Sequence, residues 1–208
     1  HDTHVTGLIG TARVLSALKD RWSGTIVFVA QPAEEIVAGA RAMLADGLYT
    51  RFPKPDYALA LHTVAYLPAG KIGYGEGPFL ANVSSLDIQV RGVSGHGSAP
   101  DTAKDPVVLA SQIVLALQTI VSRQLNISKE PAVLSIGQIN GGNRENIVPE
   151  SVEMVGTLRA FDEAMRADAK ERIQRTAESI ASASGATAEV SFGPSAYPVT
   201  TNPEALTE

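Results

Sequence analysis

An apolar run followed at once by a proline and two adjacent acids constrains this fold more than any other stretch of the sequence. Residues 25–30 (TIVFVA) are mostly β-branched or aromatic and do not alternate with polar residues. That pattern is typical of a strand buried on both faces of a parallel sheet. Pro32 has no backbone N–H, so strand pairing is expected to stop there. Glu34 and Glu35 are then expected at the carboxyl end of the strand, where open α/β sheets bind ligands.

Two interpretations of the acid pair stay open at this point. Neighbouring carboxylates repel each other, so the pair could simply be a solvated acidic turn. In a metal site the two acids would instead divide the work, one as a ligand and the other as the proton acceptor for a water molecule. Partners elsewhere in the chain must decide between these interpretations.

The first 84 residues alternate predicted helices and strands, as in α/β folds. Apolar residues recur at helical spacing from His4 to near Gly24, and residues 40–46 indicate a short helix that ends at Gly47. A second buried strand is predicted at 56–62, and short strands are predicted at 71–74 and 79–83.

From residue 86 the pattern changes to strict alternation, which predicts a strand covered on one face only. Asp105 and Pro106 supply an N-cap and a first-turn proline for a long helix that ends near Arg123. The order strand, helix, strand, strand, helix, strand follows and matches a ferredoxin-like βαββαβ arrangement. Its later elements are strands at 132–139 and 152–161, a helix from Asp162, and a strand at 187–192.

Composition narrows the class of protein. The 208 residues are 44% hydrophobic and 19% charged, with a net charge of -5, so no basic footprint for nucleic acid is present. No apolar stretch in the sequence indicates a membrane span, and the absence of cysteine excludes disulfides and thiolate metal sites in this chain. We expect a cytoplasmic protein, although a lost secretion signal stays open because the N-terminus looks cut inside a fold.

Three of the four histidines fall within the first 62 residues. His1 and His4 lie three positions apart at a helix entrance and can share a face. His62 ends a predicted strand, as the acid pair does. Each has an ordinary alternative, namely a surface or tag-derived histidine at the N-terminus and a near-core histidine at 62. Imidazoles and carboxylates together at sheet ends are what a zinc, manganese or cobalt site requires.

Five motifs together resemble one known group, the di-metal aminoacylase/carboxypeptidase-like metallopeptidases. The closest resemblance is to the amidohydrolase branch that contains hippurate hydrolase and the plant auxin-conjugate hydrolases. The resemblance covers essentially all 208 residues, and each motif is modest alone. The motifs are His1-Asp2-x-His4, Pro32–Glu35, Leu61–His62, Gly95–Pro100 and Asn146–Pro149.

The resemblance implies an α/β fold with two domains. Residues 1–84 would be a partial di-metal catalytic domain, 85–193 an inserted ferredoxin-like lid and dimerisation domain, and 194–208 the return to the catalytic domain. It also implies a homodimer, joined through the lid, that uses two divalent ions (Mn, Zn, Ni or Co). Such an enzyme hydrolyses the amide bond of small N-acyl or N-aroyl amino acids to a carboxylate and a free amino acid.

The resemblance also assigns roles to particular residues. Glu34 would be the general base, and His96 would stabilise the oxyanion in the neighbouring subunit's site. The metal ligands would be His1, Glu35 and His62, and the substrate would be held by Asn146 and Arg159. In the strand from Val152, Met154 and Leu158 share one face, so Arg159 is expected on the open face.

The chain departs from the family pattern at two metal ligands. The bridging cysteine would stand two positions before His1, and the last ligating histidine lies far downstream. We therefore expect this chain alone to bind metal weakly or not at all and to show negligible amidase activity. The alternative from a different class of function is a non-catalytic dimerisation or binding module.

Overall fold

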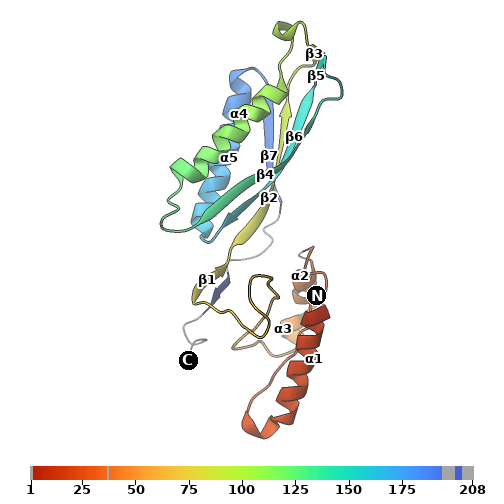
Figure 1. Cartoon of the computed structure of the whole chain (residues 1–208), viewed down its shortest axis with the longest axis vertical. Coiled ribbons are helices and arrows are strands. Elements are labelled where there is room, and N and C mark those ends of the chain that lie inside the picture. The colour runs from red at the N-terminus through yellow and green to blue at the C-terminus, as the bar shows by residue number, and fades with distance from the viewer. Residues whose placement is uncertain (1, 37, 194–199, 203–208) are drawn as a thin grey trace. The chain divides into compact units, whose positions relative to one another are not determined.

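The computed structural model describes residues 2–36, 38–193 and 200–202, and the chain divides into two compact units. Unit 1 comprises His1–Tyr74 and unit 2 comprises Gly75–Glu208. Helices and loops make up the described part of unit 1, whereas unit 2 combines sheets with two long helices (Figure 1). The chain is therefore a mixed α/β protein.

The helices of unit 1 agree with the sequence patterns. The predicted first helix is α1 (Asp2–Ala17), followed by a 3-10 turn (Lys19–Arg21), and the predicted second helix is α2 (Gly39–Ala45). Gly47 has a left-handed backbone with φ of 88°, which lets the chain leave α2 and enter α3 (Leu48–Arg51).

The strands predicted at 25–30 and 56–62 are wrong. Neither run is a strand, and their apolar side chains are exposed: Phe28 is 40% exposed and Leu59 is 82% exposed. A strand requires backbone partners on a neighbouring strand, and no described residue pairs with either run. The short strand predicted at 71–74 is also absent.

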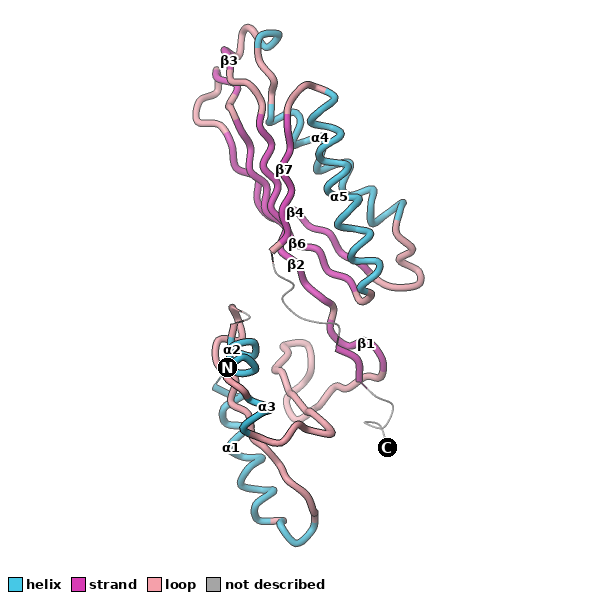
Figure 2. Tube along the Cα trace, turned by 180° about the vertical axis from the view of Figure 1, so that it is seen from behind, coloured by secondary structure: helices cyan, strands magenta, loops and turns pink. Residues whose placement is uncertain are grey.

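Unit 2 is built on a four-stranded antiparallel sheet in the order β4-β6-β2-β7. Helices α4 (Pro106–Thr119) and α5 (Glu163–Ala183) cover the same face of this sheet (Figures 1 and 2). Chain order is strand, helix, strand, strand, helix, strand, as the sequence predicts. The strands are β2 (Asn82–Arg91), β4 (Ala132–Gly141), β6 (Ser151–Ala160) and β7 (Thr187–Phe192).

Shorter elements complete unit 2. Strand β1 (Gly77–Leu80) pairs with β8 (Thr200–Asn202), and β3 (Gly95–His96) pairs with β5 (Ile147–Val148), both antiparallel. A 3-10 turn (Pro100–Thr102) precedes α4, and a π-helical turn (Ile120–Gln124) follows it.

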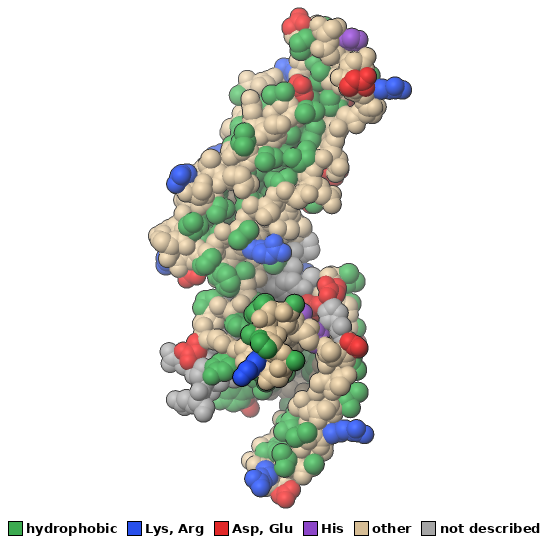
Figure 3. Space-filling view, viewed as in Figure 1, with side chains coloured by type: hydrophobic (Ala, Val, Ile, Leu, Met, Phe, Trp, Pro, Cys, Tyr) green, Lys and Arg blue, Asp and Glu red, His purple; other side chains and the backbone are tan. Residues whose placement is uncertain are grey.

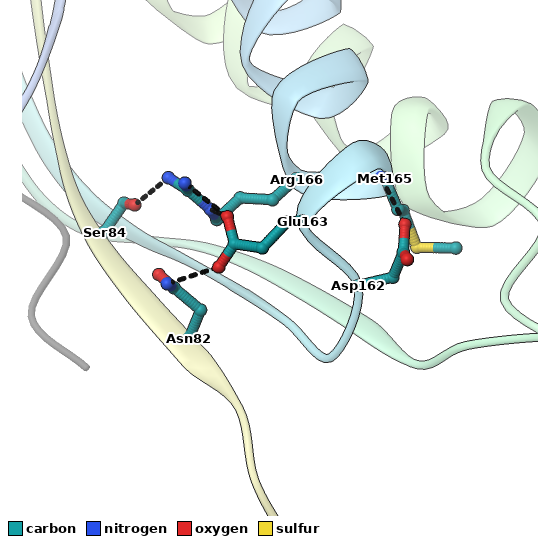
Figure 4. Close-up of polar contacts among 6 residues, drawn as sticks. All are labelled: Asn82, Ser84, Asp162, Glu163, Met165 and Arg166. Atoms are coloured by element: carbon teal, nitrogen blue, oxygen red, sulfur yellow. Dashed lines mark hydrogen bonds and ion pairs between the residues drawn. The ribbon is translucent and has the colours of Figure 1, made fainter. Parts of the chain in front are cut away.

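Aspartates begin both long helices, as predicted. The Asp105 carboxylate accepts a hydrogen bond of 2.8 Å from the Val107 N–H, and Pro106 takes the first helical position. The Asp162 carboxylate accepts a 2.6 Å bond from the Met165 N–H (Figure 4). Each cap satisfies backbone donors that the first turn of a helix leaves without an intrahelical partner.

The hydrophobic core of unit 2 lies between the sheet and its two helices. Met154 and Leu158 on β6 are fully buried there, whereas Arg159 lies on the opposite, open face, as the alternation predicts. Both helices contribute a buried stripe. The other fully buried large apolar side chains include Leu86, Ile88, Val90, Ile113, Leu117, Ile120 and Ile173.

A polar network fastens the start of β2 to the first turn of α5. Asn82 and Ser84 are buried polar residues on β2. The Asn82 amide donates a 2.8 Å hydrogen bond to the Glu163 carboxylate, to which Arg166 donates another of 2.7 Å (Figure 4). Arg166 also donates to the Ser84 hydroxyl at 3.3 Å. These partners compensate for burying polar groups at this edge of the core.

One segment of the described chain, Pro106–Gln124, is long and apolar enough to cross a membrane by length and composition alone. It spans α4 and the following turn. Leu109, Ile113 and Leu117 on this segment pack into the core of unit 2. A helix with one face buried against a sheet is typical of the core of a globular domain.

Candidate functional site

The acidic turn predicted from the sequence is present in unit 1. Glu34 and Glu35 lie in a turn between Pro32 and α2. Ala33, just before them, is the one non-glycine residue among those described with a left-handed backbone (φ of 52°). Such a conformation costs roughly 1–2 kcal/mol for a residue with a Cβ, so the surrounding contacts must hold it.

Two contacts hold this turn. The Ala38 N–H donates a 3.2 Å hydrogen bond to the Ala33 carbonyl, which closes the loop. Gly39 packs so closely that a Cβ there would lie 1.6 Å from the Pro32 carbonyl oxygen, so only glycine fits. Glu34 is half-buried and Glu35 is exposed. The two carboxylates thus have different surroundings.

Two histidines that are distant in sequence meet in unit 1. The rings of His4 on α1 and His62 stack edge to face with their centroids 4.9 Å apart. The Thr63 N–H donates a 3.1 Å hydrogen bond to His4 Nε2. His62 Nδ1 lies 2.8 Å from the Thr63 carbonyl oxygen, and because a carbonyl only accepts, the proton of His62 is on Nδ1.

These hydrogen bonds distinguish the two rings as ligands. His62 keeps its lone pair on Nε2, and a metal-ligating histidine typically donates its other ring N–H to a carbonyl in this way. The Nε2 lone pair of His4 already accepts from Thr63. The two rings therefore differ in the ring nitrogen that contacts Thr63. His4 was not among the predicted site residues, although its spacing of three from His1 indicated a shared helix face.

The described residues do not form a complete metal site. Of the three predicted ligands, His1 lies outside the described residues, which leaves Glu35 and His62. Among the residues that the structure describes, no three His, Asp or Glu side chains are grouped closely enough to hold one ion. The donor types suit zinc, manganese, nickel or cobalt, but the set is incomplete here.

Unit 2 brings His96 and Asn146 together. Strand β3 pairs with β5, and His96 stands opposite Ile147. The Gly97 N–H extends this contact by donating a 2.8 Å hydrogen bond to the Asn146 carbonyl. A Cβ at position 97 would lie 3.1 Å from that same oxygen, so a larger residue would press against it. Two of the three residues predicted to act on the substrate, His96 and Asn146, are thus held next to each other.

A shallow hollow adjoins this ladder. Its lining comes from residues 141–145 and 147–149 and from Gly97, Pro100, Asp105 and Val107. Its charged lining residues are Asp105, Arg144 and Glu145. The space-filling view shows charged side chains gathered at the end of unit 2 where β3 and β5 lie (Figures 1 and 3).

Arg159 lies at the other end of the sheet. It pairs with Val83 on β2 and Val133 on β4, and its guanidinium donates a 2.9 Å hydrogen bond to the Thr157 hydroxyl. It lies eight positions along β6 from Ser151, which begins the strand at the His96 end. At the usual rise of a strand this is about 26 Å. The structure therefore does not bring Arg159 together with His96 and Asn146.

Comparison with known proteins places these features in a family. The model of peptidase family M20/M25/M40 matches residues 1–208. An N-acetylcysteine deacetylase of Bacillus subtilis (strain 168) is 39% identical over 194 residues, which are 93% of this chain and 50% of that protein. A hippurate hydrolase of Campylobacter jejuni is 38% identical over 183 residues, covering 88% of this chain and 47% of its own length.

A solved structure is also similar. The YXEP protein of Bacillus subtilis, described as a dinuclear metal binding peptidase from the M20 family, superposes with a TM-score of 0.73 at 33% identity. The match covers 98% of this chain and 50% of that protein. The chain thus spans about half the length of the relatives it matches. The resemblance to the amidohydrolase branch is confirmed.

Proposed function

This chain belongs to peptidase family M20/M25/M40, and we propose that the protein hydrolyses the amide bond of N-acyl or N-aroyl amino acids. The products would be a carboxylate and a free amino acid. The observation that carries the proposal is the Glu34–Glu35 turn, held with Ala33 in a left-handed conformation, in a chain matched by the family along its whole length. The names of the relatives, a deacetylase and a hippurate hydrolase, support an N-acyl amino acid as the substrate.

The proposal gives Glu34 the role of general base. In amide hydrolysis a water oxygen attacks the carbonyl carbon, and the C–N bond then breaks. Glu34 would take a proton from the attacking water and deliver it to the departing amine nitrogen. A half-buried carboxylate on a braced turn can keep a fixed orientation through both transfers.

Two divalent ions, from among manganese, zinc, nickel and cobalt, are part of the proposal. Their ligands would include His1, Glu35 and His62. The hydrogen bond of His62 Nδ1 to the Thr63 carbonyl supports its role, because it directs the lone pair of the ring to Nε2.

Unit 2 would contribute the groups that stabilise the substrate. His96 would donate a hydrogen bond to the carbonyl oxygen as that oxygen gains negative charge, and Asn146 would act beside it. Arg159 would hold the free carboxylate of the amino acid, since a guanidinium binds a carboxylate bidentately. The proposed ferredoxin-like lid is residues 85–193, between parts of a catalytic domain at 1–84 and 194–208.

The distance between these groups favours a site shared by two copies of the protein. Arg159 is about 26 Å from the His96 end of the sheet, which exceeds the length of an N-acyl amino acid. One copy therefore cannot apply both groups to one substrate molecule. We propose that His96 and Asn146 of one copy act on the substrate held by its neighbour.

The outward face of α4 is the surface that best suits such a homodimer. From Pro106 to Ser122 the chain has no charged residue. Hydrophobic and uncharged side chains predominate in the space-filling view of the face that α4 occupies (Figure 3). A surface without charges does not repel a copy of itself, and apolar side chains gain free energy when covered. We call the exposed residues Val107, Val108, Ser111, Gln112, Leu115 and Gln118 the α4 surface.

The same surface supports the alternative function, a non-catalytic association module.

Substitution of Glu34 by glutamine distinguishes the hydrolase from the association module, because it removes the general base but keeps the shape of the side chain. In the protein at the length of its relatives, E34Q should retain its metal by elemental analysis and lose at least about 10²-fold in kcat. The matched control is E171Q on α5. Wild-type protein without metal and without turnover would leave only the association module.

Leu115 tests the dimer. It is 72% exposed in the middle of the α4 surface, so L115K introduces a charge there without touching the core. Light scattering should show a dimer for wild type and a monomer for L115K at micromolar concentration. Q174K, which adds the same charge to the exposed face of α5, should remain dimeric. A dimer that persists in L115K would refute this surface.

A further inference from the structure

The loop that carries His96 fixes the backbone of this residue from both sides. Strand pairing of β3 with β5 holds its main chain, and the Ser94 hydroxyl donates a 2.8 Å hydrogen bond to the Val148 carbonyl just before it. Just after it, the Ala99 N–H donates a 2.9 Å bond to the His96 carbonyl and closes a tight turn. Ser98 lies inside this turn and faces the imidazole ring.

Ser98 makes two contacts with the same ring nitrogen. Its backbone N–H donates a 3.1 Å hydrogen bond to His96 Nδ1, and its hydroxyl lies 2.7 Å from that atom. A backbone N–H can only donate, so Nδ1 must be the nitrogen that lacks a proton. The hydroxyl then donates as well, and the proton of the neutral ring is on Nε2.

This arrangement decides what the ring can do for a substrate. With the proton on Nε2, the nitrogen that faces away from Ser98 is a donor and can stabilise an oxygen that gains negative charge. With the other tautomer the same nitrogen would present a lone pair and would repel that oxygen. We propose that Ser98 is a positioning residue that fixes the Nε2–H tautomer and the orientation of His96 for amide hydrolysis.

This inference rests on the proposed function of His96 but can be tested apart from it. The first measurement is the ring ¹⁵N spectrum of the whole chain at a pH where the ring is neutral. Only four histidines are present, and the H96Q spectrum identifies the signals of His96. Wild type should show one tautomer with the proton on Nε2. S98A keeps the backbone donor but loses the shorter bond, so its spectrum should shift toward a mixture of tautomers.

The second measurement is kinetic and uses the protein at the length of its relatives, because the chain alone is expected to show negligible amidase activity. Loss of one oxyanion donor typically costs about 10²–10³-fold in kcat, so H96A should fall in that range. S98A, which only loosens the donor, should lose about tenfold in kcat with little change in KM. S98T restores the hydroxyl and should recover both the rate and the single tautomer. S179A, which removes a hydroxyl from the exposed face of α5, is the control.

The outcomes are distinguishable. A ring spectrum in S98A that equals that of wild type overturns the inference, whatever the kinetics. A mixture of tautomers with kcat unchanged shows that Ser98 orients the ring without serving the reaction, and this also overturns it. If wild type hydrolyses no N-acyl amino acid, the proposed function fails, while the spectra still decide whether Ser98 fixes the ring.

Discussion

The two units differ most in how they treat their apolar side chains. In unit 2 one face of the four-stranded sheet packs against two helices. Residues such as Ile88, Leu117 and Leu158 are fully buried between them. In unit 1, Gly39 is the one buried residue among those described. The run at 25–30 is more continuously apolar than β2, yet Phe28 and its neighbours are exposed. Hydrophobicity alone does not bury a segment, because burial also requires a partner surface.

The largest expected difference between the units is in amide hydrogen exchange. Amides of β2 and β6 pair with neighbouring strands and open only when the sheet unfolds. Amides at 25–30 have no strand partner among the described residues. Exchange in β2 should therefore be slower by on the order of 10³-fold or more, given a typical domain stability. Comparable protection at 26–29 in the whole chain would show that the run does find a partner.

A matched pair of leucines tests the same difference energetically. Leu158 is fully buried in the core of unit 2, whereas Leu59 in unit 1 is 82% exposed. L158A should lower the free energy of unfolding by about 2–5 kcal/mol, because it leaves a cavity. L59A should change it by less than about 0.5 kcal/mol. Urea unfolding followed by circular dichroism measures both, and a large effect of L59A would mean that Leu59 is packed in solution.

The sequence predicted unit 2 well because its elements find their partners within unit 2 itself. The predicted strand at 187–192 coincides with β7, Asp105 is the N-cap of α4 as predicted, and α5 begins after Asp162 as expected. Alternation also put Arg159 on the open face. Each of these inferences depends on local chemistry or on a period that the sequence displays directly.

Prediction of unit 1 and of the site was less complete, for physical reasons. The apolar run at 56–62 indicates a segment that favours burial, but it does not reveal whether a partner strand is present. The acidic turn was recognised from Pro32, Glu34 and Glu35, whereas the left-handed Ala33 had no sequence signal. The predicted functions of His1, Glu35 and the other site residues stay predictions. The contact of Ser98 with His96 depends on a turn geometry that no motif reports.

A moderate effect is expected from the helix caps. D105A removes the acceptor for the first N–H groups of α4 and should destabilise unit 2 by about 1 kcal/mol. D20A is the control: it removes a negative charge from unit 1, where it caps neither α4 nor α5. It should leave the unfolding of unit 2 unchanged. Thermal unfolding resolves this difference. Equal effects of the two substitutions would argue that the loss in D105A is a general charge effect rather than a lost cap.

The smallest expected effect concerns pH and Lys170 on α5. Burial, and then the nearby Arg166 guanidinium, lower the pKa of Lys170 below its ordinary value, while Glu163 opposes them. Between the folded and unfolded pKa values the unfolded chain binds more protons, so stability should rise as the pH increases through that alkaline range. At neutral pH the cost of holding the charged amine is present in full.

Replacement of Lys170 therefore tests whether burial in unit 2 changes the protonation of its charged side chains. K170M keeps the length of the side chain and removes the titrating amine, so the alkaline rise in stability should disappear while stability at neutral pH increases slightly. K71M in unit 1, where the segment is exposed, should keep the rise. Urea unfolding at several pH values between 7 and about 10 gives both slopes. If stability depends on pH in the same way in K170M and wild type, groups other than Lys170 cause the alkaline rise. The difference in burial between the two units would then not affect the pKa values of their charged side chains.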